Sequence, residues 1–409
     1  KVMKFTEGGV TAAKGFEAAG AEAQIKYKNR MDMALVYSKV PCVSAGTFTS
    51  NVVKAAPVLW DKNIVDTKET AQAVVVNSGI ANACTGKQGM DICKKEAECA
   101  GRLLGIPADA VLVASTGVIG MQIPEDRICA GIEKLAAAKT DTLKAGNDAA
   151  RAIMTTDTVF KEVAVEIELS GKKVTLGGMC KGSGMIHPNM CTMLGFVTTD
   201  AAISKELLVK AVKKDVIDSF NMISVDGDTS TNDTLLVLAN GMAENPVITE
   251  ENEDYKVFCE ALHAVTTTLA KKMAGDGEGA TALFETKVIH ADTKQNARIL
   301  AKSVICSSLT KAAIFGHDAN WGRILCALGY SGVNFDPENV DLYFEAEGKK
   351  MAIFSKGVAC DYSEEEASAI LSCKEVTALV DMHMGEESAT AWGCDLSYDY
   401  VKINADYRS

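Results

Sequence analysis

The sequence predicts an α+β fold in which sheets and helices are stacked in layers. Short apolar runs rich in β-branched residues occur between stretches of helical periodicity, and some of these runs follow one another as hairpins. They do not show the strict strand–helix alternation that is typical of a doubly wound sheet. Only seven prolines occur in 409 residues, and no Pro/Ser-rich linker or fixed-period repeat interrupts the chain. The elements are therefore expected to be closely connected.

The first half of the chain carries signals for both kinds of element. The Ser170-Gly171 pair lies between two alternating segments and indicates a tight hairpin turn. Two glycine-containing polar loops, NSGIANACTG (77–86) and STGVIG (115–120), each follow an expected strand directly. Strands are expected at 72–76, 111–114, 161–170 and 172–177, and helices at 88–104, 125–138 and 143–154.

The second half begins after a Gly- and Met-rich loop. Its first apolar run, MLGFVTT (193–199), predicts a core strand. Further strands are expected at 234–239, 281–290, 341–346 and 375–381, and helices at 203–219, 252–273, 294–310 and 363–372.

Composition argues against several classes of protein. The formal net charge is −12 and no basic patch is visible, which argues against nucleic-acid binding. No apolar run reaches 18 residues and no signal-peptide pattern is found, so no association with a membrane is expected. The thirteen cysteines form no C-x-x-C pair, which predicts reduced thiols. A soluble, cytoplasmic protein is expected.

The most unusual stretch is CKGSGMIHPNMCTMLGFVTTD (180–200), in which a Gly-rich loop leads directly into the strand-like run at Thr192. One interpretation is a strained turn that enters a buried strand. The other is N-terminal nucleophile chemistry, in which the Thr192 hydroxyl attacks the carbonyl of Cys191 and hydrolysis of the resulting ester frees the Thr192 amine. An α-amine has a pKa of about 7.7–8.0, so it can act as general base for the hydroxyl of the same residue.

The STGVIG motif (115–120) offers groups that suit an oxyanion. The backbone N–H of Gly117 and the hydroxyl of Thr116 are donors of the kind that stabilise a negative oxygen at an attacked carbonyl. The alternative interpretation is an ordinary Ser-Thr-Gly turn, which is common at strand ends.

The remaining motifs indicate no cofactor and no metal. GDGEGA (275–280) lacks dinucleotide-loop spacing, and neither a P-loop nor G-x-S-x-G occurs. DGDTSTND (226–233) has no glycine at the sixth position of a calcium loop, and Val237 stands at the twelfth position, where such a loop has glutamate. The motif is interpreted as an ordered turn. Of the five histidines, His187 lies in the unusual loop and His317 in another motif, and the others lie in ordinary helix or strand contexts.

Eight motifs, taken together and in order, resemble the ArgJ family of bifunctional glutamate N-acetyltransferase/ornithine acetyltransferase enzymes. They are NSGIANACTG (77–86), STGVIG (115–120), MTTDT (154–158), KGSGMIHPNMCTML (181–194), SVDGDTSTND (224–233), GDGEGAT (275–281), FGHDANWGRI (315–324) and NADYRS (404–409). The resemblance extends over the whole chain.

The resemblance implies a layered αββα-type core, as in DmpA and ArgJ proteins, with a smaller C-terminal lobe. It also implies self-cleavage between Cys191 and Thr192, which gives fragments 1–191 and 192–409 that share one intertwined core. Two copies of each fragment are expected to form a heterotetramer. Cys191 stands where the family usually has a small alanine or glycine; the residue is still small, so cleavage is expected to survive. His187 stands where the family commonly has alanine, near enough to the scissile bond to alter the cleavage rate.

The resemblance further assigns roles to named residues. Thr192 is the nucleophile and carries the acetyl group, and Thr116 and Gly117 form the oxyanion hole. Substrate contacts are implied for Thr155 (with Thr156 as the adjacent possibility), Lys181, Thr192, Glu278, Asn404 and Ser409. Lys181 is expected to pair with a substrate carboxylate and Glu278 with an amine.

The implied reaction is a ping-pong transfer of acetyl from N2-acetylornithine to glutamate in arginine biosynthesis. Acetyl-CoA remains open as an additional donor. Two alternatives remain: a self-processing, aminopeptidase-like hydrolase, and an amino-acid-binding protein without catalysis in which 180–200 is only a structural loop.

Overall fold

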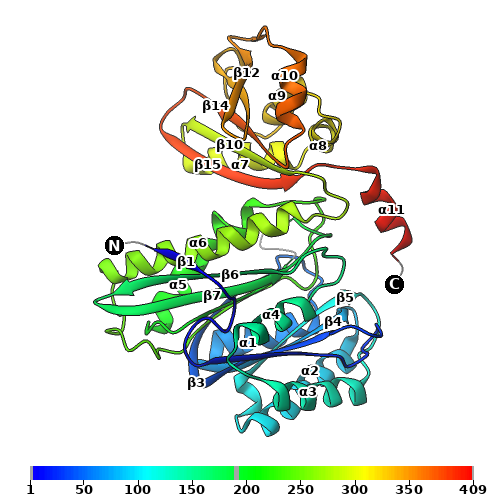
Figure 1. Cartoon of the computed structure of the whole chain (residues 1–409), viewed down its shortest axis with the longest axis vertical. Coiled ribbons are helices and arrows are strands. Elements are labelled where there is room, and N and C mark those ends of the chain that lie inside the picture. The colour runs from blue at the N-terminus through cyan, green and yellow to red at the C-terminus, as the bar shows by residue number, and fades with distance from the viewer. Residues whose placement is uncertain (1–2, 188–192, 408–409) are drawn as a thin grey trace.

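The computed structural model describes residues 3–187 and 193–407, so Cys191, Thr192 and Ser409 lie outside the described residues. A large layered body carries a smaller C-terminal lobe above it (Figure 1). The body contains β1 (Lys4–Thr6), β2 (Phe16–Ala21), β3 (Met33–Phe48), α1 (Ala56–Thr67), β4 (Thr70–Ile80), α2 (Gly86–Leu104), β5 (Val111–Val118), α3 (Glu125–Ala138), α4 (Leu143–Ala152), β6 (Lys161–Leu169), β7 (Lys172–Lys181), β8 (Leu194–Thr199), α5 (Lys205–Ile217), β9 (Thr234–Ala239) and α6 (Glu253–Gly275).

All strands of the body belong to one nine-stranded sheet, in the order β1-β6-β7-β8-β9-β3-β4-β5, with β2 also paired to β3. The long strand β3 divides this sheet in two. Its first part, 33–38, pairs with β2, and its second part, 43–48, pairs with β9. The register with β4 shifts between Tyr37 and Cys42, where the strand is irregular. The sheet therefore consists of two halves that meet at β3: one contains β1 and β6 to β9, and the other contains β2, β4 and β5.

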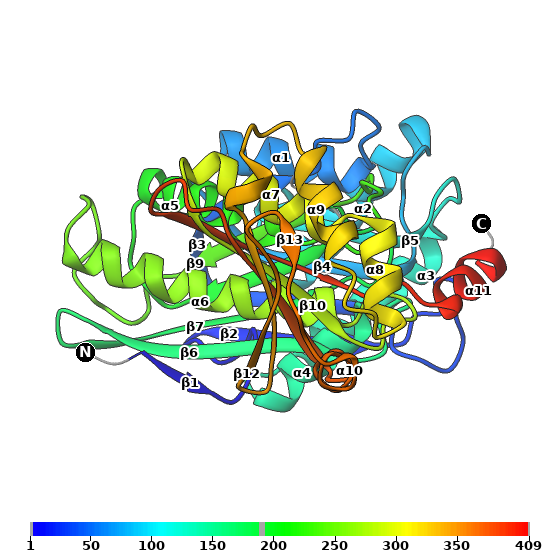
Figure 2. The same cartoon turned by 90° about the horizontal axis from the view of Figure 1, so that it is seen from above.

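Alternating side chains place the two sheet halves between helices. In β4, Val74 and Val76 belong to the apolar cluster between the halves, whereas Ala73 and Val75 belong to the cluster under α2 and α3. In β9, Leu236 and Leu238 point to the middle cluster, and the intervening Val237 joins the cluster that contains α5 and α6. The result is the αββα layering that the sequence and its resemblance predicted, with α4 lying between the two halves (Figure 1). Seen from above, the layers overlap and α11 projects to one side of the molecule (Figure 2).

The chain on either side of position 192 contributes to this one sheet. Strands β8 and β9 come after it, yet they lie in the middle, between β7 and β3. Leu194 pairs with Lys181 across β7 and β8, and with Thr234 across β8 and β9. Separating the two stretches would break two strand ladders and expose fully buried apolar side chains, each worth roughly 1.5–3 kcal/mol.

The C-terminal lobe is built on a six-stranded sheet in the order β13-β12-β11-β14-β10-β15. After the sheet, the chain leaves the lobe and ends in a helix, α11, that lies beside the body (Figure 1). The elements are β10 (Leu283–Ala291), α7 (Lys294–Ile305), α8 (Ser308–Phe315), α9 (Trp321–Gly329), β11 (Asp341–Ala346), β12 (Lys349–Ser355), β13 (Val358–Ala359), α10 (Glu364–Leu371), β14 (Glu375–Asp381), β15 (Glu387–Cys394) and α11 (Tyr398–Asp406).

Several expectations for single elements need correction. The helix expected at 294–310 is two helices, because Ser307 accepts a hydrogen bond from the Thr310 amide and begins α8. The motifs expected as loops after the strands at 72–76 and 111–114 are partly strand, since β4 and β5 continue to Ile80 and Val118. In the described ranges no helix is long and apolar enough to cross a bilayer.

Candidate active site

A cavity of about 260 Å³ lies where β5 and β7 end in the body. Its walls come from segments far apart in sequence: the end of β5, the loop before β6, the end of β7, the loop after α6, and α11. Every described residue to which the resemblance assigned a role lines it: Thr116, Gly117, Thr155, Thr156, Lys181, Glu278 and Asn404.

The backbone at Gly117 can exist only with glycine. Gly117 has φ of +139°, and a Cβ there would lie 2.1 Å from the carbonyl carbon of Gly79 on the adjacent strand β4. Asn232 fixes the neighbouring backbone, because its amide nitrogen donates to the carbonyls of Ala81 (2.6 Å) and Ser115 (2.7 Å). The end of β5 is thus held rigidly where Thr116 and Gly117 meet the cavity.

Lys181 is the last residue of β7, and its side chain is almost fully buried in the cavity wall. Its ammonium donates to the hydroxyl of Thr155 (2.9 Å) and to the hydroxyl of Thr116 (3.1 Å). Burial lowers the pKa of Lys181, and the nearby carboxylate of Asp157, 3.9 Å away, opposes this shift.

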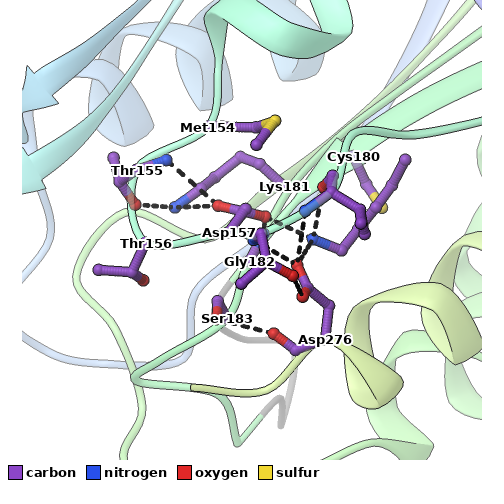
Figure 3. A network of polar contacts seen from close by, with 12 residues as sticks. Met154, Thr155, Thr156, Asp157, Cys180, Lys181, Gly182, Ser183 and Asp276 are labelled. Atoms are coloured by element: carbon purple, nitrogen blue, oxygen red, sulfur yellow. Dashed lines mark hydrogen bonds and ion pairs between the residues drawn. The ribbon is translucent and has the colours of Figure 1, made fainter. Parts of the chain in front are cut away.

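Behind Lys181 lies a buried charge network (Figure 3). The ammonium of Lys161, which is fully buried, contacts Asp157 Oδ2 (2.6 Å) and Asp276 Oδ2 (2.7 Å). Asp157 also accepts the backbone N–H of Gly182 (2.8 Å). Burial alone would raise the pKa of Asp157, but the ammonium groups of Lys181 and Lys161 outweigh it and lower the pKa to about 2. Asp157 therefore stays ionised and holds both lysines in place.

Glu278 supplies the negative side of the cavity. Its carboxylate accepts from the Thr156 hydroxyl (2.8 Å) and from the Asn404 side-chain amide (2.6 Å). Gly184 permits this position, because a Cβ there would lie 2.1 Å from Glu278 Oε1. The two threonines therefore have different partners: Thr155 contacts Lys181, and Thr156 contacts Glu278.

The chain is anchored on both sides of positions 188–192. Before them, Asp226 accepts from the amides of Met185 (2.7 Å) and Ile186 (2.8 Å). After them, Asp233 accepts from the amide of Met193 (2.8 Å). Both aspartates belong to DGDTSTND (226–233), which the sequence indicated only as an ordered turn. Thr192 and Cys191 are next to this anchor in sequence but lie outside the described residues.

His187 stands at the end of the first anchored segment. Its Nδ1 lies 3.0 Å from the Ser224 hydroxyl and 3.7 Å from the Cys306 sulfur. Burial, together with the positive charge of Lys302, lowers the pKa of His187 to about 4. The imidazole is thus neutral near pH 7.

Sequence reasoning missed the supporting residues of this site. Lys161, Asp157, Asp276 and Asn232 belong to no motif with a recognised ligand spacing, and their roles depend on tertiary contacts. One signal was available: Asp157, Asn232 and Asp276 lie in motifs that were singled out, MTTDT, SVDGDTSTND and GDGEGAT. The cavity they support combines one cation, one anion and several hydroxyls, which suits a small zwitterionic molecule.

Comparison with known proteins agrees with the resemblance to the ArgJ family that the motifs showed. The model of the ArgJ family matches residues 17–409. The arginine biosynthesis bifunctional protein ArgJ of Symbiobacterium thermophilum is 53% identical over 409 residues, with full coverage of both chains. ArgJ 1 of Clostridium acetobutylicum is 52% identical over 402 residues, covering 98% of this chain and 97% of that protein.

Two crystal structures are also similar. That of the arginine biosynthesis bifunctional protein argJ from Bacillus halodurans is 46% identical and covers 53% of this chain and 100% of its own, with a TM-score of 0.51. That of ornithine acetyltransferase complexed with ornithine, from Mycobacterium tuberculosis, is 40% identical and covers 46% of this chain and 99% of its own, with a TM-score of 0.43.

The layered body and its polar cavity define an α+β enzyme that acts on a small molecule. With the family model and full-length relatives at about half identity, the chain belongs to the ArgJ family.

Proposed function

We propose that this enzyme transfers the acetyl group of N2-acetylornithine to glutamate, with Thr192 as the nucleophile. The observation that carries the proposal is the cavity in which Lys181 and Glu278 face the end of β5. Ornithine and glutamate are zwitterions, so a buried cation and a buried anion match their carboxylates and amines. Asn404 and Thr156 hold the Glu278 carboxylate in place for an amine, and the Lys181 ammonium is available to a carboxylate.

The first step is self-cleavage between Cys191 and Thr192. The Thr192 hydroxyl attacks the Cys191 carbonyl, the acyl group moves from nitrogen to oxygen, and water hydrolyses the ester. This leaves a Cys191 carboxylate and a free Thr192 amine. The anchors at Asp226 and Asp233 support this step, because they fix the chain before and after the scissile bond.

The length of a solved relative also supports cleavage. The Bacillus halodurans chain is covered completely by 53% of this chain, or about 217 residues. The proposed fragment 192–409 has nearly this length. We propose that two copies of it assemble with two copies of 1–191 in a heterotetramer.

In the acetyl transfer, the Thr192 hydroxyl attacks the acetyl carbonyl while the Thr192 amine accepts its proton. The Gly117 N–H and the Thr116 hydroxyl stabilise the oxyanion, and ornithine leaves with the proton. The amine of glutamate then attacks the acetyl-threonine ester, giving N-acetylglutamate and restoring the free hydroxyl. The ester divides one amide transfer into two easier steps. No cofactor takes part.

A denaturing gel tests the proposal against a non-catalytic binding protein. Freshly purified wild-type protein should give two bands, and Thr192→Ala should give one. A single uncut wild-type band would favour the binding protein.

An acetyl-acceptor assay tests it against a self-processing hydrolase. With acetylornithine and glutamate, N-acetylglutamate should form at the rate at which ornithine is released. Release of free acetate in place of N-acetylglutamate would identify a hydrolase. The same assay with acetyl-CoA as donor determines whether the enzyme uses both donors.

A further inference from the structure

One edge of the C-terminal lobe brings together imidazoles and carboxylates that are distant in sequence. Strands β10 and β14 are parallel, with Ile289 opposite Asp381, so His290 follows at the same edge. Strand β11 is antiparallel to β14, with Asp341 opposite Asp381. His383 lies two residues beyond Asp381. The register of three neighbouring strands therefore collects two histidines and two aspartates.

The side chains converge on Asp381. Its Oδ1 lies 2.9 Å from Nδ1 of His290 and 3.4 Å from Nδ1 of His383. One ligand atom from each of the three residues lies within 4.8 Å of the others. Zinc–nitrogen and zinc–oxygen bonds are about 2.0–2.1 Å long, so two ligand atoms in a tetrahedral site are about 3.3 Å apart. Small side-chain movements would bring the three atoms onto one ion.

Asp341 sets the orientation of His383. Its Oδ2 lies 2.7 Å from Nε2 of His383, and its Oδ1 accepts the hydroxyl of Ser355 (2.6 Å). Asp341 therefore holds Nε2 of His383 and turns Nδ1 toward Asp381, so that a metal ion bound there would take the place of a proton on Nδ1. A carboxylate on the outer nitrogen of a histidine is the usual second partner of a metal-binding imidazole.

We propose that His290, Asp381 and His383 form a binding site for a divalent late first-row metal ion such as Zn²⁺. Two imidazole nitrogens and one carboxylate oxygen favour such ions over Mg²⁺ or Ca²⁺, which take oxygen ligands. The two histidines are half exposed, so water completes the coordination. The ion would fasten the ends of β10 and β14 to the segment after β14. It lies on a different sheet from the acetyl-transfer cavity and is independent of the proposed reaction.

The competing explanation is a set of histidine–aspartate ion pairs that need no metal. The chain offers a matched control for it: His263 lies 2.8 Å from Asp215 and is similarly half exposed, but no second imidazole accompanies this pair among the described residues. A metal site should depend on His290 and His383 together, and not on His263.

The test is calorimetric titration of the whole, metal-free protein with Zn²⁺ near neutral pH. The wild type and three variants, His290→Asn, His383→Asn and His263→Asn, are compared. All four carry the same thirteen cysteines, so binding to thiols is equal in each. The wild type and His263→Asn should bind one equivalent that His290→Asn and His383→Asn lose or bind at least tenfold more weakly. Identical isotherms for all four proteins would overturn the proposal.

Co²⁺ spectroscopy identifies the ligand type and guards against misfolding. The wild type should show visible d–d absorption from this equivalent without a thiolate-to-cobalt charge-transfer band, and His383→Asn should lose it while keeping wild-type circular dichroism. If the first equivalent of Co²⁺ gave only a thiolate band, unchanged in His383→Asn, the metal would lie on cysteines and the site would be contradicted. Asp341→Asn should weaken binding about 10- to 100-fold, because it removes only the orienting partner.

Discussion

The ammonium of Lys181 donates a hydrogen bond over 3.1 Å to the hydroxyl oxygen of Thr116. Since the lysine is the donor, the hydroxyl hydrogen of Thr116 is left to donate to a second acceptor. An oxyanion beside Gly117 is such an acceptor. The buried cation thus acts on the proposed oxyanion hole through one threonine.

Lys181→Met should lower kcat by about 100-fold, because a charged donor that supports the oxyanion hole is lost. The Met side chain fills similar space, and Asp157 keeps Lys161 as a counterion. Steady-state kinetics of acetyl transfer measure this effect. A change confined to KM would show that Lys181 only binds substrate.

Thr116→Val should lower kcat by roughly 10²–10³-fold, since valine has the same shape but no hydroxyl. Thr116→Ser, which keeps the hydroxyl, should retain most of the activity. In the double variant with Lys181→Met, the two losses should not add, because the residues act through one hydrogen bond. Additive losses would mean that the residues act separately.

Lys161→Met should destabilise the protein by about 3–5 kcal/mol, because Asp157 and Asp276 would lose a buried counterion. Urea unfolding measures the change. Lys144→Met is the control, since it removes only an exposed ion pair with Asp148 worth about 0–1 kcal/mol. Equal effects of the two substitutions would contradict a structural role for the buried network.

The buried network of the wild type also predicts that the free energy of unfolding falls at acid pH, and we call this fall the acid limb. The folded pKa of Asp157, about 2, lies below its ordinary value of 3.8. The folded state therefore gains stability above pH 4 and loses it as the pH falls toward 2. This limb should be weaker in Lys161→Met, where one of the two cations that lower the pKa of Asp157 is gone. An unchanged acid limb would contradict the assignment.

Glu96→Gln should make the protein more stable above pH 7. Glu96 of α2 is fully buried, neither of its carboxylate oxygens has a hydrogen-bond partner among the described residues, and burial raises its pKa to about 8. Between pH 4.5 and 8 the folded state keeps a proton that the unfolded state releases, so this group lowers stability by about 1.4 kcal/mol per pH unit. Glutamine, which stays neutral, removes that slope.

Thermal melts from pH 5 to 8.5 test whether Glu96 lowers the stability of the protein as the pH rises. The wild type should lose more stability than Glu96→Gln as the pH rises. A steeper loss in the variant would show that the ionised carboxylate is stabilised by the fold.

The sequence predicted those elements whose apolar pattern is regular. Strand β3 was missed because Pro41 and Lys39 interrupt its alternation, and the register with β4 shifts at that place. A proline without an N–H is tolerated where a strand is irregular. Helix α11 was missed because none of its residues is buried, so it has no apolar face to recognise.

The candidate site likewise contains residues that the sequence predicted and residues that it did not. Residues in long motifs, such as Lys181 and Glu278, were placed by resemblance, and the structure brings them to one cavity. The buried position of Lys161 depends on Asp276, 115 residues away in sequence, and no local pattern reveals such a pair. His290 and His383 likewise meet only through strand register.

The central claim is that a threonine freed by cleavage carries the acetyl group, and intact-mass and peptide spectrometry after brief incubation with acetylornithine tests it most directly. We expect a fragment that begins at Thr192 and gains one acetyl group on that residue, which glutamate then removes. An uncleaved chain, or an acetyl group on any other residue, would contradict the account.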